Sequence, residues 1–173
     1  QLAEQANVSV LLTDAVAAEL PIERRYPVWS GRVSAIRGYL GAFEVEWGQA
    51  NPIDLEVCTR CNACIHACPE QAIDYSYQID LARCKAHRAC VKACGDIKAI
   101  DFEREDTSRS ERFDLVLDLS DRPLLDTPQP PQGYFAPGAD AMALARAVRE
   151  LGQMTGEFEK PKVLEYQEKI CAH

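Results

Sequence analysis

The chain has 173 residues, of which 47% are hydrophobic and 27% are charged. This length and composition allow one buried core, or a small module with two modest flanking regions, in a folded protein. The formal net charge of -8 excludes nucleic-acid binding, and the lack of an apolar run of roughly 20 residues excludes direct membrane insertion.

The N-terminal region, residues 1–51, opens with two short elements. Residues 8–12, with the sequence VSVLL, predict a strand, and residues 14–20 are compatible with a helix that Pro21 ends. The chain begins with Gln1 rather than Met and shows no signal-peptide pattern, so we expect a processed chain or an excised part of a longer polypeptide.

A hairpin is predicted between residues 32 and 47. Phe43, Val45 and Trp47 alternate with two glutamates, which is the period of a strand with one apolar face. The segment 38–41, GYLG, supplies glycines for a turn before this strand. We expect the apolar face of the hairpin to pack on the neighbouring module.

The central region, residues 52–103, holds seven of the eight cysteines. Gaps of two and three residues favour metal ligation over disulfides, which would be strained across such short spans. Metal-ligating cysteines of this kind are typical of a reducing compartment, so we expect a cytoplasmic protein.

An internal duplication organises this central region. The matching segments are residues 54–58 and 80–84, residues 64–68 and 90–94, and, after one inserted residue, residues 72–75 and 99–102. Each half therefore predicts a strand, a cysteine loop, a short helix and a second strand.

The first half reads Cys58-x2-Cys61-x2-Cys64-x3-Cys68-Pro69, which resembles the bacterial-type dicluster ferredoxins. Two-residue gaps let one tight loop deliver three thiolates around one face of a cubane cluster. The resemblance implies an α+β fold whose centre is a pseudo-two-fold dicluster ferredoxin domain. It also implies that the chain transfers electrons through two iron–sulfur clusters. The sequence offers no paired carboxylates and no nucleophile–base arrangement, so we expect no catalytic residues in this chain.

In this family the last cysteine of each half ligates the cluster of the other half. Carried over, the resemblance gives the first 4Fe-4S cluster the ligands Cys58, Cys61, Cys64 and Cys94. It gives the second cluster Cys68, Cys84 and Cys90, with His87 where the family has a cysteine. Gly95 also replaces the proline expected after the last cysteine.

Three interpretations of His87 remain open. A neutral imidazole could ligate the fourth iron and raise the potential of the cluster, as histidine does in Rieske centres. Alternatively, the fourth iron is missing and the site holds a 3Fe-4S cluster, or His87 only shields a degenerate site. The uncertainty concerns the second cluster alone.

Zinc is the rival metal for this region. Zinc sites usually take two Cys-x2-Cys pairs separated by a longer loop, and seven interleaved cysteines offer no natural tetrahedral set. His66 lies between Cys64 and Cys68, but its counterpart in the second half is Lys92, so we expect an exposed helix residue rather than a ligand.

The C-terminal region, residues 104–173, carries no recognisable chemistry. Residues 103–112 predict a charged linker, residues 113–119 a strand, residues 123–137 a Pro-rich loop and residues 139–154 an amphipathic helix. Cys171 either opens another cluster motif beyond this chain or is an ordinary thiol.

Basic residues flank the second set of ligands, namely Arg83, Lys85, Arg88 and Lys92, whereas the first loop contains only Arg60. Positive charge near a cluster raises its potential, so the two clusters are expected to be unequal. The patch of Lys85, Arg88 and Lys92 is either a solvated helix face or the docking surface for an acidic redox partner.

The flanking segments 7–12 and 33–45 loosely resemble iron–sulfur and flavoprotein subunits of heterodisulfide-reductase-type complexes. This resemblance implies a larger multi-cluster protein that works beside a flavoprotein. No Gly-x-Gly-x-x-Gly motif is present, so any flavin would be bound elsewhere. The alternative to a plain electron carrier is therefore an electron-feeding part of a redox enzyme whose active site lies outside this chain.

Overall fold

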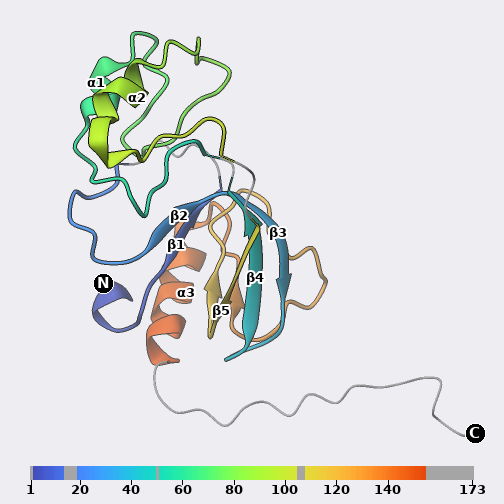
Figure 1. Cartoon of the computed structure of the whole chain (residues 1–173). Coiled ribbons are helices and arrows are strands. Elements are labelled where there is room, and N and C mark those ends of the chain that lie inside the picture. Colours follow the sequence, from blue (N-terminus) through green and yellow to red (C-terminus); the bar gives the residue numbers. More distant parts are fainter. Residues whose placement is uncertain (1, 14–18, 50, 105–107, 155–173) are drawn as a thin grey trace, which may run out of the picture.

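The computed structural model describes residues 2–13, 19–49, 51–104 and 108–154. Within them the chain forms a part built from strands and one long helix, and a cysteine-rich part at one end of it (Figure 1). The cysteine-rich part carries α1, Ala63–Ala67, and α2, Ala89–Cys94, which lie side by side. Both helices and strands are present, as an α+β fold requires.

The strands make three small sheets in the described part of the chain. The pairs are β1, Val10–Leu12, parallel to β2, Val28–Ser30, and β6, Val116–Leu117, parallel to β7, Tyr134–Phe135. The third sheet is antiparallel, with the order β3, Arg32–Arg37, β4, Phe43–Gly48, and β5, Ser108–Phe113. Short 3₁₀ turns lie at Leu2–Glu4 and Gly95–Ile97.

The predicted hairpin is formed by β3 and β4, which pair in antiparallel register. Phe43, Val45 and Trp47 are its apolar face, and they are 0%, 7% and 1% exposed. The turn needs Gly38, whose φ is 106° and whose missing Cβ would lie 2.1 Å from the carbonyl oxygen of Ala42. The hairpin is therefore a core element and not a surface loop.

The charged linker predicted over residues 103–112 is wrong, because residues 108–113 form β5. This strand lies at the edge of the sheet and most of its side chains are exposed, so its sequence carries no apolar period. Side-chain contacts stabilise it instead: the Ser110 hydroxyl donates to Glu44 on the paired strand β4 at 3.0 Å, and Arg109 forms an ion pair at 2.6 Å with Glu56, which lies outside the sheet.

The strand predicted over residues 113–119 is also wrong in its extent. Phe113 ends β5, and only Val116–Leu117 form β6. The chain turns between these two strands, so residues 113–119 contribute to both the β3–β4–β5 sheet and the β6–β7 sheet.

The predicted helix near residues 139–154 is confirmed as α3, Ala141–Gln153. It begins at Asp140, whose carboxylate accepts a hydrogen bond from the backbone N–H of Met142 at 2.8 Å. Ala147 and Leu151 are buried on its inner face. The Pro-rich segment before it is mainly loop, and β7 lies within it.

The strand predicted over residues 8–12 is present as β1, whereas most of the helix predicted over residues 14–20 lies outside the described residues. Cys171 also lies outside them. Among the residues described, no helix is both long and apolar enough to span a bilayer.

The duplication reappears in backbone pairing. Isolated β-bridges join Ile53 to Ile100 and Ile73 to Ile79. Ile53 and Ile79 precede the cysteines of the first and second halves, and Ile73 and Ile100 follow them. Each bridge therefore joins the start of one half to the end of the other. Matching hydrogen bonds run from the N–H of Cys58 to the Asp54 carbonyl and from Cys84 to Asp80, at 2.8 and 3.0 Å. The two cysteine segments therefore share one local backbone design.

A single buried cluster joins the two parts of the molecule. It contains Val28 from β2 together with apolar residues and cysteines of the central region. Leu55, in the first half, is 4% exposed within this cluster, whereas its counterpart Leu81 is 60% exposed. The segment around Leu55 is therefore covered, whereas the matching segment around Leu81 is open to solvent.

Candidate metal centre

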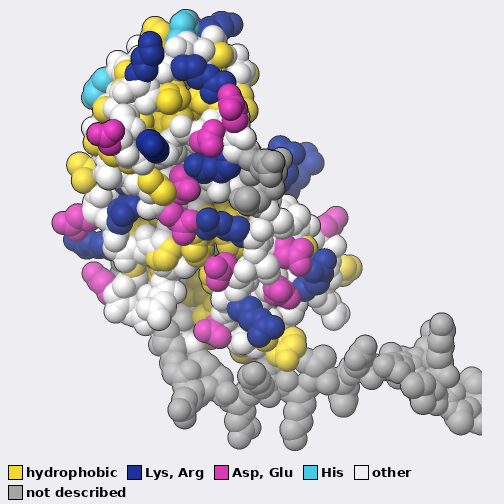
Figure 2. All heavy atoms as spheres, viewed as in Figure 1, with side chains coloured by type: hydrophobic (Ala, Val, Ile, Leu, Met, Phe, Trp, Pro, Cys, Tyr) yellow, Lys and Arg dark blue, Asp and Glu magenta, His cyan; other side chains and the backbone are white. Residues whose placement is uncertain are grey.

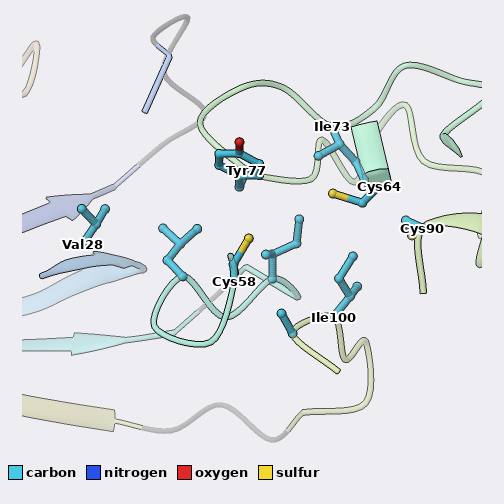
Figure 3. Close-up of a cluster of buried hydrophobic side chains, with 10 residues drawn as sticks. Val28, Cys58, Cys64, Ile73, Tyr77, Cys90 and Ile100 are labelled. Atoms are coloured by element: carbon cyan, nitrogen blue, oxygen red, sulfur yellow. The ribbon is translucent and has the colours of Figure 1, made fainter. Parts of the chain in front are cut away.

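Four cysteines from both halves of the duplication line one pocket. Cys58, Cys61 and Cys64 come from the first loop and α1, and Cys94 comes from the end of α2. The pocket is a small hollow that is partly open to solvent. Its other lining residues are mainly apolar: Ile53, Thr59, Tyr77, Ile97, Ala99 and Ile100. Figure 3 shows the sulfur atoms of Cys58 and Cys64 between Tyr77 and Ile100.

Left-handed backbone turns shape the first loop. Arg60 and Asn62 have φ values of 58° and 64°, and Asn62 leads directly into α1. The backbone N–H of Arg60 points back to the Cys58 sulfur at 3.4 Å. Because non-glycine residues adopt this conformation only when their surroundings hold them there, the loop is a constrained structure.

The second loop has the same backbone plan. Ala86 and Arg88, at the positions that match Arg60 and Asn62, have φ values of 57° and 58°. Arg88 leads into α2, and its guanidinium lies 4.1 Å from the centre of the Phe102 ring. The two loops are thus equivalent in shape but have different side-chain supports.

Burial raises the pKa of thiols in the pocket, so they do not ionise readily without a cation nearby. Burial raises the pKa of Cys64 to about 12, helped by the neighbouring thiols of Cys58 and Cys61. The pKa of Cys58 is raised for the same main reason, although the Arg60 N–H and the Arg60 charge oppose the shift. Thiols of this kind become thiolates when metal ions supply the positive charge, so the donor set fits a soft metal centre.

A phenol stands beside the same thiols. Tyr77 is 2% exposed, and its hydroxyl donates to the Arg60 carbonyl at 3.0 Å and also contacts Asn62 Oδ1. Burial, followed by the charges of Cys58 and Cys64, raises the pKa of Tyr77 to about 12. Tyr77 therefore remains a neutral hydrogen-bond donor that supports the first loop.

The second set of predicted ligands includes three neighbouring thiols. Cys90 is buried at 7% exposure, and its pKa is raised by burial and by the nearby Cys68 and Cys84 thiols. Cys68 comes from the first half of the duplication, and its sulfur accepts a hydrogen bond from the Ala72 N–H at 3.4 Å. The structure thus brings a first-half cysteine to the two cysteines of the second half.

His87 faces a carboxylate. Its Nε2 atom lies 3.8 Å from Oε1 of Glu70, and both side chains are partly exposed. Across the described residues, no group of three or more His, Cys, Asp and Glu side chains could hold a single metal ion, so His87 and the three thiols do not converge on one point.

The other residues singled out in and around the cysteine motifs differ in exposure. His66 is exposed, as predicted for a helix residue with a lysine counterpart. None of the seven described cysteines forms a disulfide. All four cations near the second loop, Arg83, Lys85, Arg88 and Lys92, are exposed, whereas Arg60 is only 2% exposed.

Sequence reasoning missed Tyr77. It lies in the segment that joins the two halves, outside both cysteine motifs and without a counterpart in the duplication. The only available signal was this lack of a counterpart, because a residue that breaks a repeat often serves one half alone. The burial of Arg60 left no signal in the sequence.

A family model described as a 4Fe-4S binding domain matches residues 52–74. The match covers Cys58, Cys61, Cys64 and Cys68 and supports an iron–sulfur, ferredoxin-type domain with a 4Fe-4S cluster in this chain. No curated protein matches the chain.

Proposed function

We propose that the chain transfers single electrons through two iron–sulfur clusters whose ligands are exchanged between the halves of the duplication. The observation that carries this proposal is the pocket that combines Cys58, Cys61 and Cys64 with Cys94, which is 30 or more residues further along the chain. The neighbourhood of Cys68, Cys84 and Cys90 supports a second site with the reciprocal exchange.

An iron–sulfur cluster, when bound, accepts and releases one electron with little movement of its ligands. The chain contributes the thiolates that hold it, and the apolar lining of the first pocket keeps water away. The backbone N–H of Arg60 donates to the Cys58 sulfur and so stabilises its negative charge. Cys61 is exposed, which leaves this side of the pocket accessible to an electron donor or acceptor.

The fit favours a polynuclear cluster over zinc. Four thiolates on one zinc ion at 2.3 Å would lie about 3.8 Å apart around a single point. Among the described residues, no group of three or more His, Cys, Asp or Glu side chains is placed to hold a single ion, and residues 52–74 match a 4Fe-4S binding domain. Cysteines that do not converge on one ion fit ligands at separate corners of a cluster.

For the second site we propose a 3Fe-4S cluster held by Cys68, Cys84 and Cys90. The position of His87 beside Glu70, on an exposed loop, supports the loss of the fourth protein ligand. The interpretation in which His87 ligates the fourth iron predicts a different iron content and is tested separately below.

The proposed partner is an acidic redox protein that docks on Lys85, Arg88 and Lys92. These side chains are exposed beside the second loop, and Figure 2 shows Lys and Arg side chains gathered over the end of the molecule that carries α1 and α2. Opposite charges speed such encounters and orient the partner. A flavoprotein partner and a role within a larger redox protein remain predictions.

Iron and inorganic sulfide analysis of protein purified without oxygen tests the proposal, together with electron paramagnetic resonance of its oxidised and reduced states. One 4Fe-4S and one 3Fe-4S cluster predict a paramagnetic signal from the 3Fe-4S cluster in the oxidised protein and one from the 4Fe-4S cluster in the reduced protein. The ligand exchange is tested by C94S, which we expect to alter the same signal as C61S, and by C68S, which should alter the same signal as C90S. Protein without inorganic sulfide would refute the proposed function.

A further inference from the structure

One buried cation lies in the first cysteine loop. Arg60 lies between Cys58 and Cys61 in the sequence and is 2% exposed. Its backbone N–H lies 3.4 Å from the Cys58 sulfur, so the residue is attached directly to the first site. The matching position in the second loop is Ala86, which has the same left-handed backbone but is exposed. Only the first loop therefore carries an internal charge.

The partners of the Arg60 guanidinium leave its charge uncompensated. Nη1 donates to the backbone carbonyl of Pro21, while Nε is buried and has no hydrogen-bond partner. Within the described residues, no carboxylate forms an ion pair with Arg60. An arginine stays protonated under these conditions, and a buried charge without a counter-charge is strongly unfavourable.

The cysteines of the adjoining pocket are a source of negative charge next to Arg60, whose backbone N–H lies 3.4 Å from the Cys58 sulfur. As thiolates around a cluster they carry a net negative charge, which increases by one when the cluster is reduced. A cation held in a low-dielectric environment acts on this charge far more strongly than an exposed cation, which water and salt screen. Burial therefore matters more here than the number of cations nearby.

We propose that Arg60 is the buried counter-charge of the first cluster and raises its reduction potential. This inference rests on the first cluster of the proposed function. The number of nearby cations would favour the second cluster, but water and salt screen these cations because all of them are exposed: Arg83, Lys85, Arg88 and Lys92. The charge of Arg60 changes the electrostatic potential at the cluster, and the hydrogen bond to Pro21 holds the side chain in place. Arg60 is thus a positioning residue and not an iron ligand.

The test is a redox titration of the intact holoprotein, followed by the paramagnetic resonance of the first cluster. We compare R60Q, which removes the charge but keeps a polar N–H donor of similar side-chain shape, with R60K, which keeps the charge. The matched control is R24Q. Arg24 is exposed and donates to the Glu56 and Cys58 carbonyls at 2.6 and 3.3 Å, so R24Q removes an exposed cation that contacts the same loop.

For R60Q we expect the equilibrium constant for reduction to fall about tenfold, which is 59 mV for a one-electron couple. R60K should show less than half of this shift. The R60Q shift should persist in about 1 M salt, where the Debye length is only about 3 Å, whereas any R24Q shift should vanish. Equal shifts in R60Q and R24Q, or no shift in R60Q, would overturn the inference.

Loss of the first cluster in a variant is also informative. If R60Q loses the cluster while R60K keeps it, the charge is required and the inference is supported. If both variants lose it equally, shape and not charge is the requirement, and the inference is wrong. These results differ from failure of the proposed function, in which the unmodified protein contains no cluster.

Discussion

The hydroxyl of Tyr77 donates a hydrogen bond to the backbone carbonyl of Arg60 at 3.0 Å, with both residues 2% exposed. This bond ties the segment between the two halves to the strained turn of the first loop, since Arg60 has a φ of 58°. The second loop has no such bond from a tyrosine among the described contacts and is supported by Arg88 on Phe102. The first site is thus the more preorganised of the two.

Removing the hydroxyl should weaken the first site selectively. In Y77F the buried Arg60 carbonyl loses its donor, at a cost of about 1–3 kcal/mol. We expect the first cluster to be lost about tenfold faster to an iron chelator, while the second cluster is lost at an unchanged rate. The control is Y75F, because Tyr75 is 44% exposed. Equal loss of both clusters in Y77F would show that Tyr77 supports the whole fold.

Replacing His87 distinguishes a ligand from a bystander. If the second site holds three irons, H87C supplies a fourth thiolate and raises the iron content from about seven to about eight atoms per chain. The signal of the oxidised protein should disappear at the same time. H87A should leave both iron content and spectrum unchanged, because the imidazole faces Glu70. A changed spectrum in H87A would instead identify His87 as an iron ligand.

Reversing the basic patch should change electron transfer in opposite directions for acceptors of opposite charge. With K85E, R88E and K92E combined, the rate to an acidic flavoprotein acceptor should fall at least about tenfold at low salt. The rate to a basic acceptor such as cytochrome c should rise. Stopped-flow absorbance measures both rates across a salt series.

The matched control for the patch combines R112E, R146E and R149E, which reverse three exposed arginines on β5 and α3. This variant has the same net charge as the patch variant. The docking proposal fails if both triple variants respond alike, because net charge alone would then explain the rates.

Asp118 should stabilise the segment around β6 and β7 in a pH-dependent way. It is 4% exposed and accepts hydrogen bonds from Ser120, from the Leu124 N–H at 2.7 Å and from the Tyr134 hydroxyl. Burial acts to raise the pKa of Asp118, but these bonds outweigh it and lower the pKa below the ordinary 3.8. The folded state therefore favours the ionised carboxylate.

Since the folded pKa is the lower one, this stabilisation is complete above about pH 4 and is lost as the pH falls through the folded value. At pH 7, D118N should lower the free energy of local opening by about 2 kcal/mol, measured by hydrogen exchange of the Val116 and Asp118 amides. Its difference from the unmodified protein should shrink in acid. D121N, at an exposed position, is the control, and an equal effect there would contradict the assignment.

Hydrophobic periodicity within a short segment predicted the elements that bury one face of their own residues. Alternation of apolar and acidic residues predicted the hairpin of β3 and β4, and the helical period predicted α3. β5 was missed because its exposed residues need no apolar period, and because its partner β4 lies about sixty residues earlier in the chain. Pairing over such a distance leaves little trace in a local window.

The sequence by itself determined the candidate ligands, their spacing and the duplication, because a cysteine loop and its matching turns are local features of the chain. Only the tertiary structure decided which half is covered. Leu55 and Leu81 occupy matching positions, yet one is 4% and the other 60% exposed. Residues 20–24 form hydrogen bonds with residues 56–75 of the first half, and Leu55 shares a buried cluster with Val28. The same asymmetry buries Arg60 and leaves the second loop in solvent, so the electrostatic difference between the two sites depends on long-range packing that no count of charges reveals.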